Sequence, residues 1–272
     1  MESDYARFQR EGWQRVAGKY EHAWAALTRL FIPALLDAAH VSAGQRVLDV
    51  ACGPGYVAEA ARGRGATPTG VDISSEMIRI ARERHREIDF RVGDATALEL
   101  ESSHFDTVVS NFGVIHAPDY VRAFAEARRV LRPRGVFAFT VWAGPGGSAG
   151  GRLMDSALRA HADMKVRVPQ GPDSVILASP DASRAMLTAA GFDAETVTFE
   201  TITHGWRVPT ASFIFELERD AGVRTAALLA RQTPETLDAI QRDVEAGMRA
   251  FEDASGFLVP YTAHVISAQA GP

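Results

Sequence analysis

A glycine-rich turn with an aspartate beside it is the part of this sequence best suited to chemistry. The stretch VLDVACGPGYVAEAA (residues 47–61) passes from an apolar run through Gly53-x-Gly55-x-x-Ala58 into an alanine-rich segment. Glycines in such a turn let the backbone approach a ligand closely and adopt positive φ angles, as nucleotide-binding loops do. Asp49 lies inside the apolar run, four residues before the first glycine. The ligand of this loop must therefore accept a neighbouring carboxylate.

Two more aspartates follow at spacings that favour a nucleoside. Asp72 ends a β-rich run 72 − 53 = 19 residues after the first glycine, close to the ~20 residues expected for a ribose-binding acid. Asp94 ends the next such run. A diphosphate over the glycines would be repelled by Asp49, by ~1–4 kcal/mol at contact distance. A nucleoside with a cationic amino-acid tail, such as S-adenosylmethionine, would instead be attracted.

The segments around these acids predict an α/β fold. Short β-rich runs alternate with helical segments from residue 45 to residue 142, a pattern typical of parallel βαβ units. The carboxyl ends of parallel strands meet at one edge of the sheet, which would bring the three aspartates together. The predicted strands of this part cover residues 46–51, 67–73, 88–95, 105–112 and 135–142.

The remaining segments predict helices before this core and inside its second half. Residues 1–40 have helical spacing, and Pro33 would divide them unless it lies in a first turn. Further strands are predicted at 194–203 and 256–270. We expect three parts: a helical cap at 1–40, a cofactor-binding core of 41–204 with 256–272, and a helical lid over the substrate at 205–255.

Composition limits the class of protein. The 272 residues are 46% hydrophobic, as in a globular protein with an apolar core, and the net charge of −5 argues against a nucleic-acid binder. The single cysteine, Cys52, excludes an intrachain disulfide and fits a reducing compartment. No signal peptide and no apolar run of ~20 residues is visible. We expect a cytoplasmic protein without nucleic-acid or membrane partners, and the oligomeric state stays open, a homodimer included.

Five segments in order carry a family resemblance over about residues 40–142. VLDVACGPG, GVDIS, VGDATAL, FDTVVSNFGVIHAPD and RVLRPRG resemble the class I S-adenosylmethionine-dependent methyltransferases. They are most similar to the small-molecule branch that resembles the ubiquinone and menaquinone biosynthesis enzymes. The resemblance implies a Rossmann-like, doubly wound sheet, mostly parallel with an antiparallel C-terminal strand, together with N-terminal helices and a helical lid insertion. It also implies S-adenosylmethionine as the cofactor.

The same resemblance implies which residues surround the cofactor. Asp72 would hold the ribose, and Asp94 would accept a hydrogen bond from the adenine amino group. An aromatic residue of the N-terminal helices would cover the cofactor, with Tyr20 and Trp24 as the candidates. The other residues divide between the methionine end, lined by Asp49, Cys52, Gly53, Gly55, Asn111 and Phe112, and the adenine, lined by Ile73, Met77 and Ala95.

One position departs from the family pattern. Arg134 stands where related proteins commonly carry glycine, in the turn before the predicted strand at 135–142. That turn leads into the amino end of the strand, far from the expected ligand. The departure should affect turn geometry more than function.

His116 is the candidate catalytic residue. It follows the predicted strand at 105–112, where a substrate would approach, and it is either a substrate contact or general base, or a surface histidine. Positioning can supply roughly 7–11 kcal/mol, whereas a general base contributes about 10²–10⁴-fold, so methyl transfer does not require it. The sequence shows no spacing typical of a metal site.

The expected function is transfer of a methyl group from S-adenosylmethionine to a small-molecule acceptor, by O- or C-methylation of an apolar or aromatic metabolite. One alternative is a protein of the same fold that binds S-adenosylmethionine and runs other chemistry, such as cyclisation or decarboxylation, or only binds it. A second alternative is an NAD-dependent oxidoreductase, which Asp72 fits and Asp49 does not. The sequence does not identify the acceptor or its reacting atom.

Overall fold

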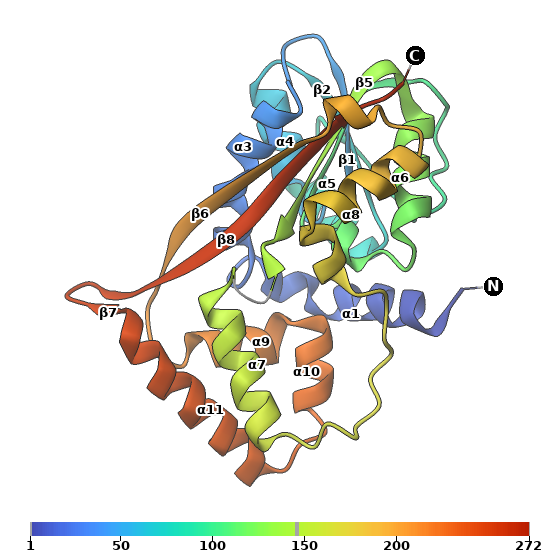
Figure 1. Ribbon diagram of the computed structural model, residues 1–272. Helices are drawn as coiled ribbons and strands as arrows, with labels where there is room; N and C mark the ends of the chain where they lie inside the picture. Colours follow the sequence, from blue (N-terminus) through green and yellow to red (C-terminus); the bar gives the residue numbers. More distant parts are fainter. Residues whose placement is uncertain (1, 145–146, 272) are drawn as a thin grey trace.

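A twisted sheet forms the core of the computed structural model, which describes residues 2–144 and 147–271 (Figure 1). The strand order is β3-β2-β1-β4-β5-β8-β6, and β7 pairs with β8 at one end. Strands β1 to β5 are parallel to one another, whereas β8 runs antiparallel to both β5 and β6. The strands are β1 (Arg46–Val50), β2 (Thr67–Asp72), β3 (Asp89–Val92), β4 (Phe105–Asn111), β5 (Leu131–Trp142), β6 (Thr198–Val208), β7 (Glu252–Asp253) and β8 (Gly256–Gln269).

This architecture confirms the predicted fold class. The middle strands are apolar over most of their length because helices cover both faces of the sheet, and Leu48, Val108 and Phe137 are buried there. The flanking helices are α3 (Ile32–Ala38), α4 (Tyr56–Gly63), α5 (Ser75–Arg84), α6 (Tyr120–Val130) and α8 (Pro180–Ala189).

Capping residues set where the functional helices begin. The Ser74 side chain accepts a hydrogen bond from the Met77 amide and starts α5, and the Asp119 side chain accepts one from the Arg122 amide and starts α6. Pro33 lies in the first turn of α3, so the N-terminal region divides into pieces there. These pieces are α1 (Asp4–Tyr20), α2 (Ala25–Thr28) and the 3₁₀ turn η1 (Arg29–Phe31) before α3.

A second group of helices lies on the far side of α1 from the sheet, as Figure 1 shows. It contains α7 (Ala149–His161), α9 (Phe213–Ala221), α10 (Val223–Leu229) and α11 (Pro234–Met248). The sequence predicts a lid of residues 205–255, but β6 continues to Val208 before the chain enters this group. Helix α7, which precedes the predicted lid, packs against α11. We call these four helices the helical layer.

Several predicted strands differ from the structure at their ends. The strand expected from residue 194 begins at Thr198, because the Asp193 side chain accepts from the Glu195 amide and turns residues 194–196 into the 3₁₀ turn η5 (Ala194–Thr196). The strand expected at 88–95 ends at Val92, and the strand expected at 135–142 begins earlier, at Leu131. The strand expected to end at residue 203 continues to Val208. Other short turns are η2 (Val114–His116), η4 (Ser174–Ala178) and η6 (Arg249–Phe251).

Candidate active site

The loop after β1 turns tightly because three of its residues have positive φ angles. The φ angles of Ala51, Gly53 and Gly55 are 56°, 51° and 87°. At Gly55 a Cβ atom would also lie 2.6 Å from Cζ of Phe90, so both conformation and space require glycine. Helix α4 begins directly after Gly55. The loop therefore presents backbone amides at the carboxyl edge of the sheet, where parallel sheets bind their ligands.

Asp72 joins the end of β2 to this loop. Its Oδ2 accepts a hydrogen bond from the Gly53 amide at 2.8 Å, and its Oδ1 accepts one from the Ser74 amide at 2.8 Å. Burial raises the pKa of the Asp72 carboxyl to about 6, although both amides oppose that rise. Each carboxylate oxygen has a second lone pair. Asp72 can therefore still accept hydrogen bonds from hydroxyl groups of a ligand.

Asp49 is fully buried, and only one of its two carboxylate oxygens has a hydrogen-bond partner among the described residues. Its Oδ2 accepts a hydrogen bond from the Ala58 amide of α4 at 3.2 Å. Its Oδ1 has no hydrogen-bond partner among residues 2–144 and 147–271. Burial raises the pKa of Asp49 well above its usual range, and the nearby Asp72 raises it further. A buried carboxylate oxygen without a partner is costly, and a cationic ligand would remove that cost.

A cavity beside the glycine loop brings together residues from three regions of the sequence. The loop and β1 supply one wall, Tyr20 and Thr28 supply a second, and the end of β4 supplies a third. Five predicted cofactor residues line this cavity: Tyr20, Asp49, Cys52, Gly53 and Asn111. Burial raises the pKa of the Cys52 thiol well above its usual range, so Cys52 contributes a small apolar surface.

The end of β4 fixes the N-terminal segment over this edge. Asn111 donates from Nδ2 to the Thr28 carbonyl at 3.0 Å, and its Oδ1 accepts from the Thr140 hydroxyl at 2.7 Å. Thr140 also accepts from the Phe112 amide at 2.8 Å. Phe112 has a φ of 56°, and its ring stacks on Trp142 at 3.9 Å between centroids. Asn111 is thus a structural bridge as well as a cavity residue.

Comparison with known proteins supports the assignment that this geometry suggests. Residues 48–139 match the family described as "Methyltransferase domain". The chain is 38% identical over 108 residues to a demethylmenaquinone methyltransferase of Renibacterium salmoninarum, which covers 40% of this chain and 46% of that protein. It is 35% identical over 133 residues to a malonyl-(acyl-carrier protein) O-methyltransferase of Pectobacterium atrosepticum, which covers 49% and 52%. The chain therefore spans about half the length of these curated relatives.

A solved structure extends the similarity of fold to most of the chain. The structure of the Haemonchus contortus phospholethanolamine N-methyltransferase 2 superposes with a TM-score of 0.57 at 18% identity, covering 97% of this chain and 60% of that one. At this identity the likeness concerns the fold alone. We refer to residues 48–139, the part of the chain that matches this family, as the methyltransferase domain.

The N-terminal helices cover the methyltransferase domain. The two aromatic candidates of this segment, Tyr20 and Trp24, contact different parts of the molecule. Tyr20 lines the cavity, and its hydroxyl lies 3.2 Å from the Thr28 hydroxyl. Burial raises the pKa of Tyr20 to about 12. Trp24 instead donates from Nε1 to the Ala221 carbonyl of α9 at 3.2 Å. Tyr20 therefore faces the methyltransferase domain's ligand edge, whereas Trp24 connects the N-terminal segment to the helical layer.

The residues predicted around the adenine lie at the same edge of the sheet, beyond the cavity. Met77 is buried in the first turn of α5, two residues after the exposed Ser75. Asp94 follows β3, and its Oδ1 accepts from both the amide and the hydroxyl of Thr96 at 2.8 Å. Ile73 follows Asp72, and Ala95 follows Asp94. The structure thus brings Ile73, Met77, Asp94 and Ala95 to the Asp72 side of the loop.

His116 has a neighbour that the sequence analysis did not identify. Its ring lies on η2 and meets Trp13 of α1 edge-on, with 4.9 Å between centroids. Burial lowers the pKa of His116 to about 4, so the imidazole is neutral over the physiological range. Trp13 precedes Tyr20 by seven residues, a spacing that puts both on one face of a helix. That spacing was the available signal.

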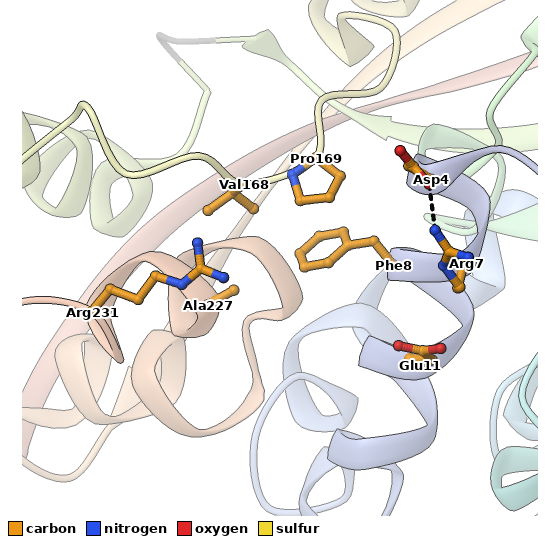
Figure 2. Close-up of a pocket in the computed structure, with 8 residues that line it drawn as sticks. All are labelled: Asp4, Arg7, Phe8, Glu11, Val168, Pro169, Ala227 and Arg231. Atoms are coloured by element: carbon orange, nitrogen blue, oxygen red, sulfur yellow. Dashed lines mark hydrogen bonds and ion pairs between the residues drawn. The ribbon is translucent and has the colours of Figure 1, made fainter.

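A larger hollow of about 320 Å³ lies elsewhere, between α1, residues 168–169 and α10 (Figure 2). Phe8 points into it from α1, and Arg231 extends toward Phe8 from the opposite side. Arg7 forms an ion pair with Asp4 at its edge. None of the predicted site residues is among its lining residues, which are Asp4, Arg7, Phe8, Glu11, Val168, Pro169, Ala227 and Arg231.

The described ranges, 2–144 and 147–271, contain neither a metal-type cluster of side chains nor a membrane-spanning helix. No group of three or more His, Cys, Asp or Glu side chains there is arranged to hold a metal ion. No helix in those ranges is long and apolar enough to cross a membrane.

Proposed function

We propose that this protein transfers a methyl group from S-adenosylmethionine to a small-molecule acceptor. One observation carries the proposal: Asp49 Oδ1, in the wall of the cavity beside the glycine loop, is buried and has no hydrogen-bond partner among the described residues. A ligand with a cationic amino-acid end would pair with this oxygen, whereas a diphosphate would be repelled by it. The methyltransferase relatives support the same reading.

The proposed cofactor contacts follow the order of the strands. Asp49, Cys52, Gly53, Gly55, Asn111 and Phe112 would surround the methionine end, and Tyr20 would cover it. Asp72 would accept hydrogen bonds from the ribose hydroxyls with the lone pairs that the Gly53 and Ser74 amides leave free. Asp94 would accept from the adenine amino group, with Ile73, Met77 and Ala95 against the ring. We propose no cofactor contact for Trp24.

The protein's own contribution to the reaction is chiefly geometric. Bound S-adenosylmethionine supplies a methyl group that a positive sulfur already activates. The chain must then hold the acceptor in line with that carbon and exclude water. His116 is the proposed proton acceptor for a hydroxyl substrate, because a neutral imidazole has a free nitrogen lone pair.

We also propose a class of acceptor and a location for the protein. The relatives' names contain demethylmenaquinone and malonyl-(acyl-carrier protein), two unlike acceptors, so they support methylation of small molecules or carried acids in general. We expect O- or C-methylation of an apolar or aromatic compound in the cytoplasm, without a nucleic-acid partner. Size-exclusion chromatography with light scattering would distinguish a monomer from the homodimer that the sequence leaves open.

A direct test measures ligand binding first and transfer second. S-adenosylhomocysteine at 100 times its dissociation constant should raise the stability of the protein by about 2.7 kcal/mol, and NADH should not raise it. Isotope-labelled S-adenosylmethionine is then incubated with a panel of phenols, quinols, amines and carboxylates. Stabilisation by NADH alone would contradict the proposal. Turnover of an acceptor with the labelled methyl group retained on the cofactor would point to the non-methylating alternative.

A further inference from the structure

We infer that Trp13 and His116 form the wall against which the acceptor lies, and that the acceptor is a planar aromatic molecule with a hydroxyl group. This inference rests on the proposed function and deepens it by naming the substrate class. It also assigns a specificity role to Trp13, on α1, outside the methyltransferase domain proper.

A series of rings connects the cavity to His116. Tyr20 lines the cavity beside Asp49 and Asn111. The centroid of the Trp13 ring lies 6.3 Å from that of the Tyr20 ring and 4.9 Å from that of the His116 ring, and both pairs meet edge-on. Both separations fall within the range of favourable aromatic pairs. A flat acceptor beside Tyr20 would therefore meet Trp13 with its ring and would reach His116 with a substituent.

Trp13 is held in place by its own helix. Its Nε1 donates to Oε1 of Gln9 at 3.1 Å, and Nε2 of Gln9 donates to the Tyr5 hydroxyl at 2.9 Å. The three residues are four apart, so they share one face of α1. Gln9 is buried, at 6% exposure. Since the only polar group of the indole is already bonded, the ring offers an acceptor an apolar surface of fixed orientation.

Hydrogen bonds to backbone carbonyls fix the turn that carries His116. The His116 amide donates to the Gly113 carbonyl at 3.0 Å. The Tyr120 hydroxyl lies 3.3 Å from the Ile115 carbonyl and 3.1 Å from the Pro172 carbonyl, which ties η2 to the segment before η4. Burial raises the pKa of the Tyr120 hydroxyl, and Tyr5 of α1 and Asp173 at the start of η4 raise it further. Burial is the cause of the lowered pKa of His116.

This arrangement suits a hydroxyl more than a carboxylate. A carboxylate acceptor has already lost its proton at neutral pH, so it gains nothing from a neutral imidazole. For a phenol, the hydroxyl oxygen forms the new bond to the methyl carbon while the carbon–sulfur bond breaks with its electron pair going to sulfur. The phenolic proton passes to a ring nitrogen of His116. The products are the aryl methyl ether, S-adenosylhomocysteine and a proton that His116 returns to water.

The test uses the full chain with labelled S-adenosylmethionine and two matched probe sets, naphthols with catechols and the corresponding naphthoates with benzoates. We expect methylation of the hydroxyl compounds. His116→Asn should lower kcat by about 10²-fold, and Trp13→Ala should raise the acceptor KM roughly three- to tenfold, the loss of one or two aromatic contacts. Phe8→Ala, in the hollow of Figure 2, is the matched control on α1 and should change neither value.

Gln9 is a positioning residue. Its substitution in the wild-type protein and in the Trp13→Phe variant separates that role from a structural one. Gln9→Met removes the acceptor for the indole N–H and should raise the acceptor KM while the dissociation constant of S-adenosylhomocysteine stays constant. In a Trp13→Phe background there is no N–H to orient, so the same substitution should have no further effect on KM. Equal effects in both backgrounds would assign Gln9 to packing alone and contradict its positioning role.

The outcomes separate this inference from the proposed function. If S-adenosylhomocysteine fails to stabilise the wild-type protein, the proposed function fails, and the inference fails with it. If it binds but no naphthol or catechol is methylated, or if only the carboxylates are, the substrate class is wrong and the cofactor assignment stands. If hydroxyl compounds are methylated and the Trp13 and His116 variants, shown to bind S-adenosylhomocysteine normally, keep wild-type KM and kcat, the proposed wall is wrong.

Discussion

Different interactions hold together the helical layer and the loop edge. We use loop edge for the carboxyl ends of β1, β2 and β4 together with the loops that follow them. At the loop edge, carboxylates bond to backbone amides: Asp72 to Gly53 and Ser74, and Asp49 to Ala58. In the helical layer, buried apolar side chains of α11 such as Ile240, Val244 and Met248 form the contact surface. Bonds between charged groups and the backbone fix positions closely, whereas apolar packing tolerates changes of residue at similar volume. We therefore expect ligand recognition at the loop edge to be sensitive to single atoms and the helical layer to be adaptable.

The loop edge also stores strain that the helical layer does not share. Ala51 and Phe112, at the ends of the adjacent strands β1 and β4, are non-glycine residues with φ of 56°. Each such residue costs roughly 1–2 kcal/mol. Other positive φ angles occur in the described residues, but those at His40, Ser103 and Arg134 lie in turns away from the cavity. Strain retained beside a ligand site is a common feature of pre-organised binding.

The largest expected effect tests the charge at the loop edge. Asp49→Asn removes the negative charge that the ammonium group of the ligand's amino-acid end would meet, so the affinity for S-adenosylhomocysteine should fall by about 10²–10³-fold, as for other broken buried charge pairs. The ligand-free protein should become more stable, since a carboxyl whose pKa is raised by burial destabilises the fold when ionised. Calorimetric titration and urea unfolding measure the two quantities.

A remote acid provides the control for that substitution. Asp106 lies near the amino end of β4, where its Oδ2 accepts from the Arg46 amide at 2.7 Å. Asp106→Asn should leave the ligand affinity unchanged. Wild-type affinity in the Asp49→Asn variant would remove the electrostatic argument for the cofactor.

The second prediction concerns pH and isolates His116. Its pKa is about 4 in the folded protein and 6.5 in its ordinary state. A lowered folded pKa gives stability that is present above pH 6.5 and is lost as the pH falls toward 4. Asp72 has the opposite sign, because its folded pKa of about 6 exceeds 3.8, and its stability contribution grows as the pH falls through 6. The two effects oppose each other in the wild-type protein.

His116→Asn removes one of these two effects. Between pH 7 and pH 4 the variant should gain about 3 kcal/mol of unfolding free energy relative to the wild type, from a shift of about 2.5 pKa units at 1.36 kcal/mol each. Urea unfolding of both proteins at several pH values measures this difference. A difference that stays constant with pH would mean that folding does not lower the pKa of His116.

The third prediction compares one glycine from each region. At Gly113 an added Cβ would collide with Cβ of Ala51 and approach the Val50 carbonyl at 3.2 Å, contacts with the strained loop. At Gly247 of α11 the three nearest atoms would all belong to the flexible side chain of Leu153 on α7. Gly113→Ala should therefore cost about 1–3 kcal/mol and weaken S-adenosylhomocysteine binding. Gly247→Ala should change stability by less than about 1 kcal/mol, since better helix propensity offsets the contact, and should leave binding unchanged.

Thermal unfolding with and without S-adenosylhomocysteine measures both variants in one experiment. Equal losses of ligand affinity in the two variants would contradict the proposed difference between the regions.

The sheet and its ligand edge could be predicted because their signals are local. One apolar run contains Asp49, the next ends at Asp72 and a third is followed by Asp94, a pattern that predicts parallel strands and their carboxyl ends. The hydrogen bond between Asp72 and Gly53 joins residues 19 apart, a pairing that only the assembled sheet creates. The positive φ angles of Ala51 and Phe112 have no signal in residue type, because alanine and phenylalanine usually avoid that conformation.

The helices were harder to place than to recognise. The amphipathic spacing of α1 and α7 is visible in the sequence, but it does not state which surface each helix covers. The contact between Trp13 and His116 depends on how α1 crosses the sheet edge, which the sequence does not give. The packing of α7 against α11 could not be predicted either, because β6 and other helices lie between them in the sequence. Apolar faces fit many partners, so their pairing is set by the whole fold.

The smallest expected effect lies far from both regions, at Arg134. The sequence departs from the family pattern there, and the structure gives Arg134 a φ of 62°. A non-glycine residue in this conformation costs roughly 1–2 kcal/mol. Glycine removes that strain but loses roughly 0.5–1 kcal/mol of chain entropy on folding. Arg134→Gly should therefore stabilise the protein by roughly 0.5–1 kcal/mol. Methyl transfer and ligand affinity should not change, because the turn enters β5 at the amino end, opposite the loop edge. A change in affinity would show that strain in this turn is transmitted along β5 to Thr140 and Asn111, and that the loop edge is less independent than its contacts indicate.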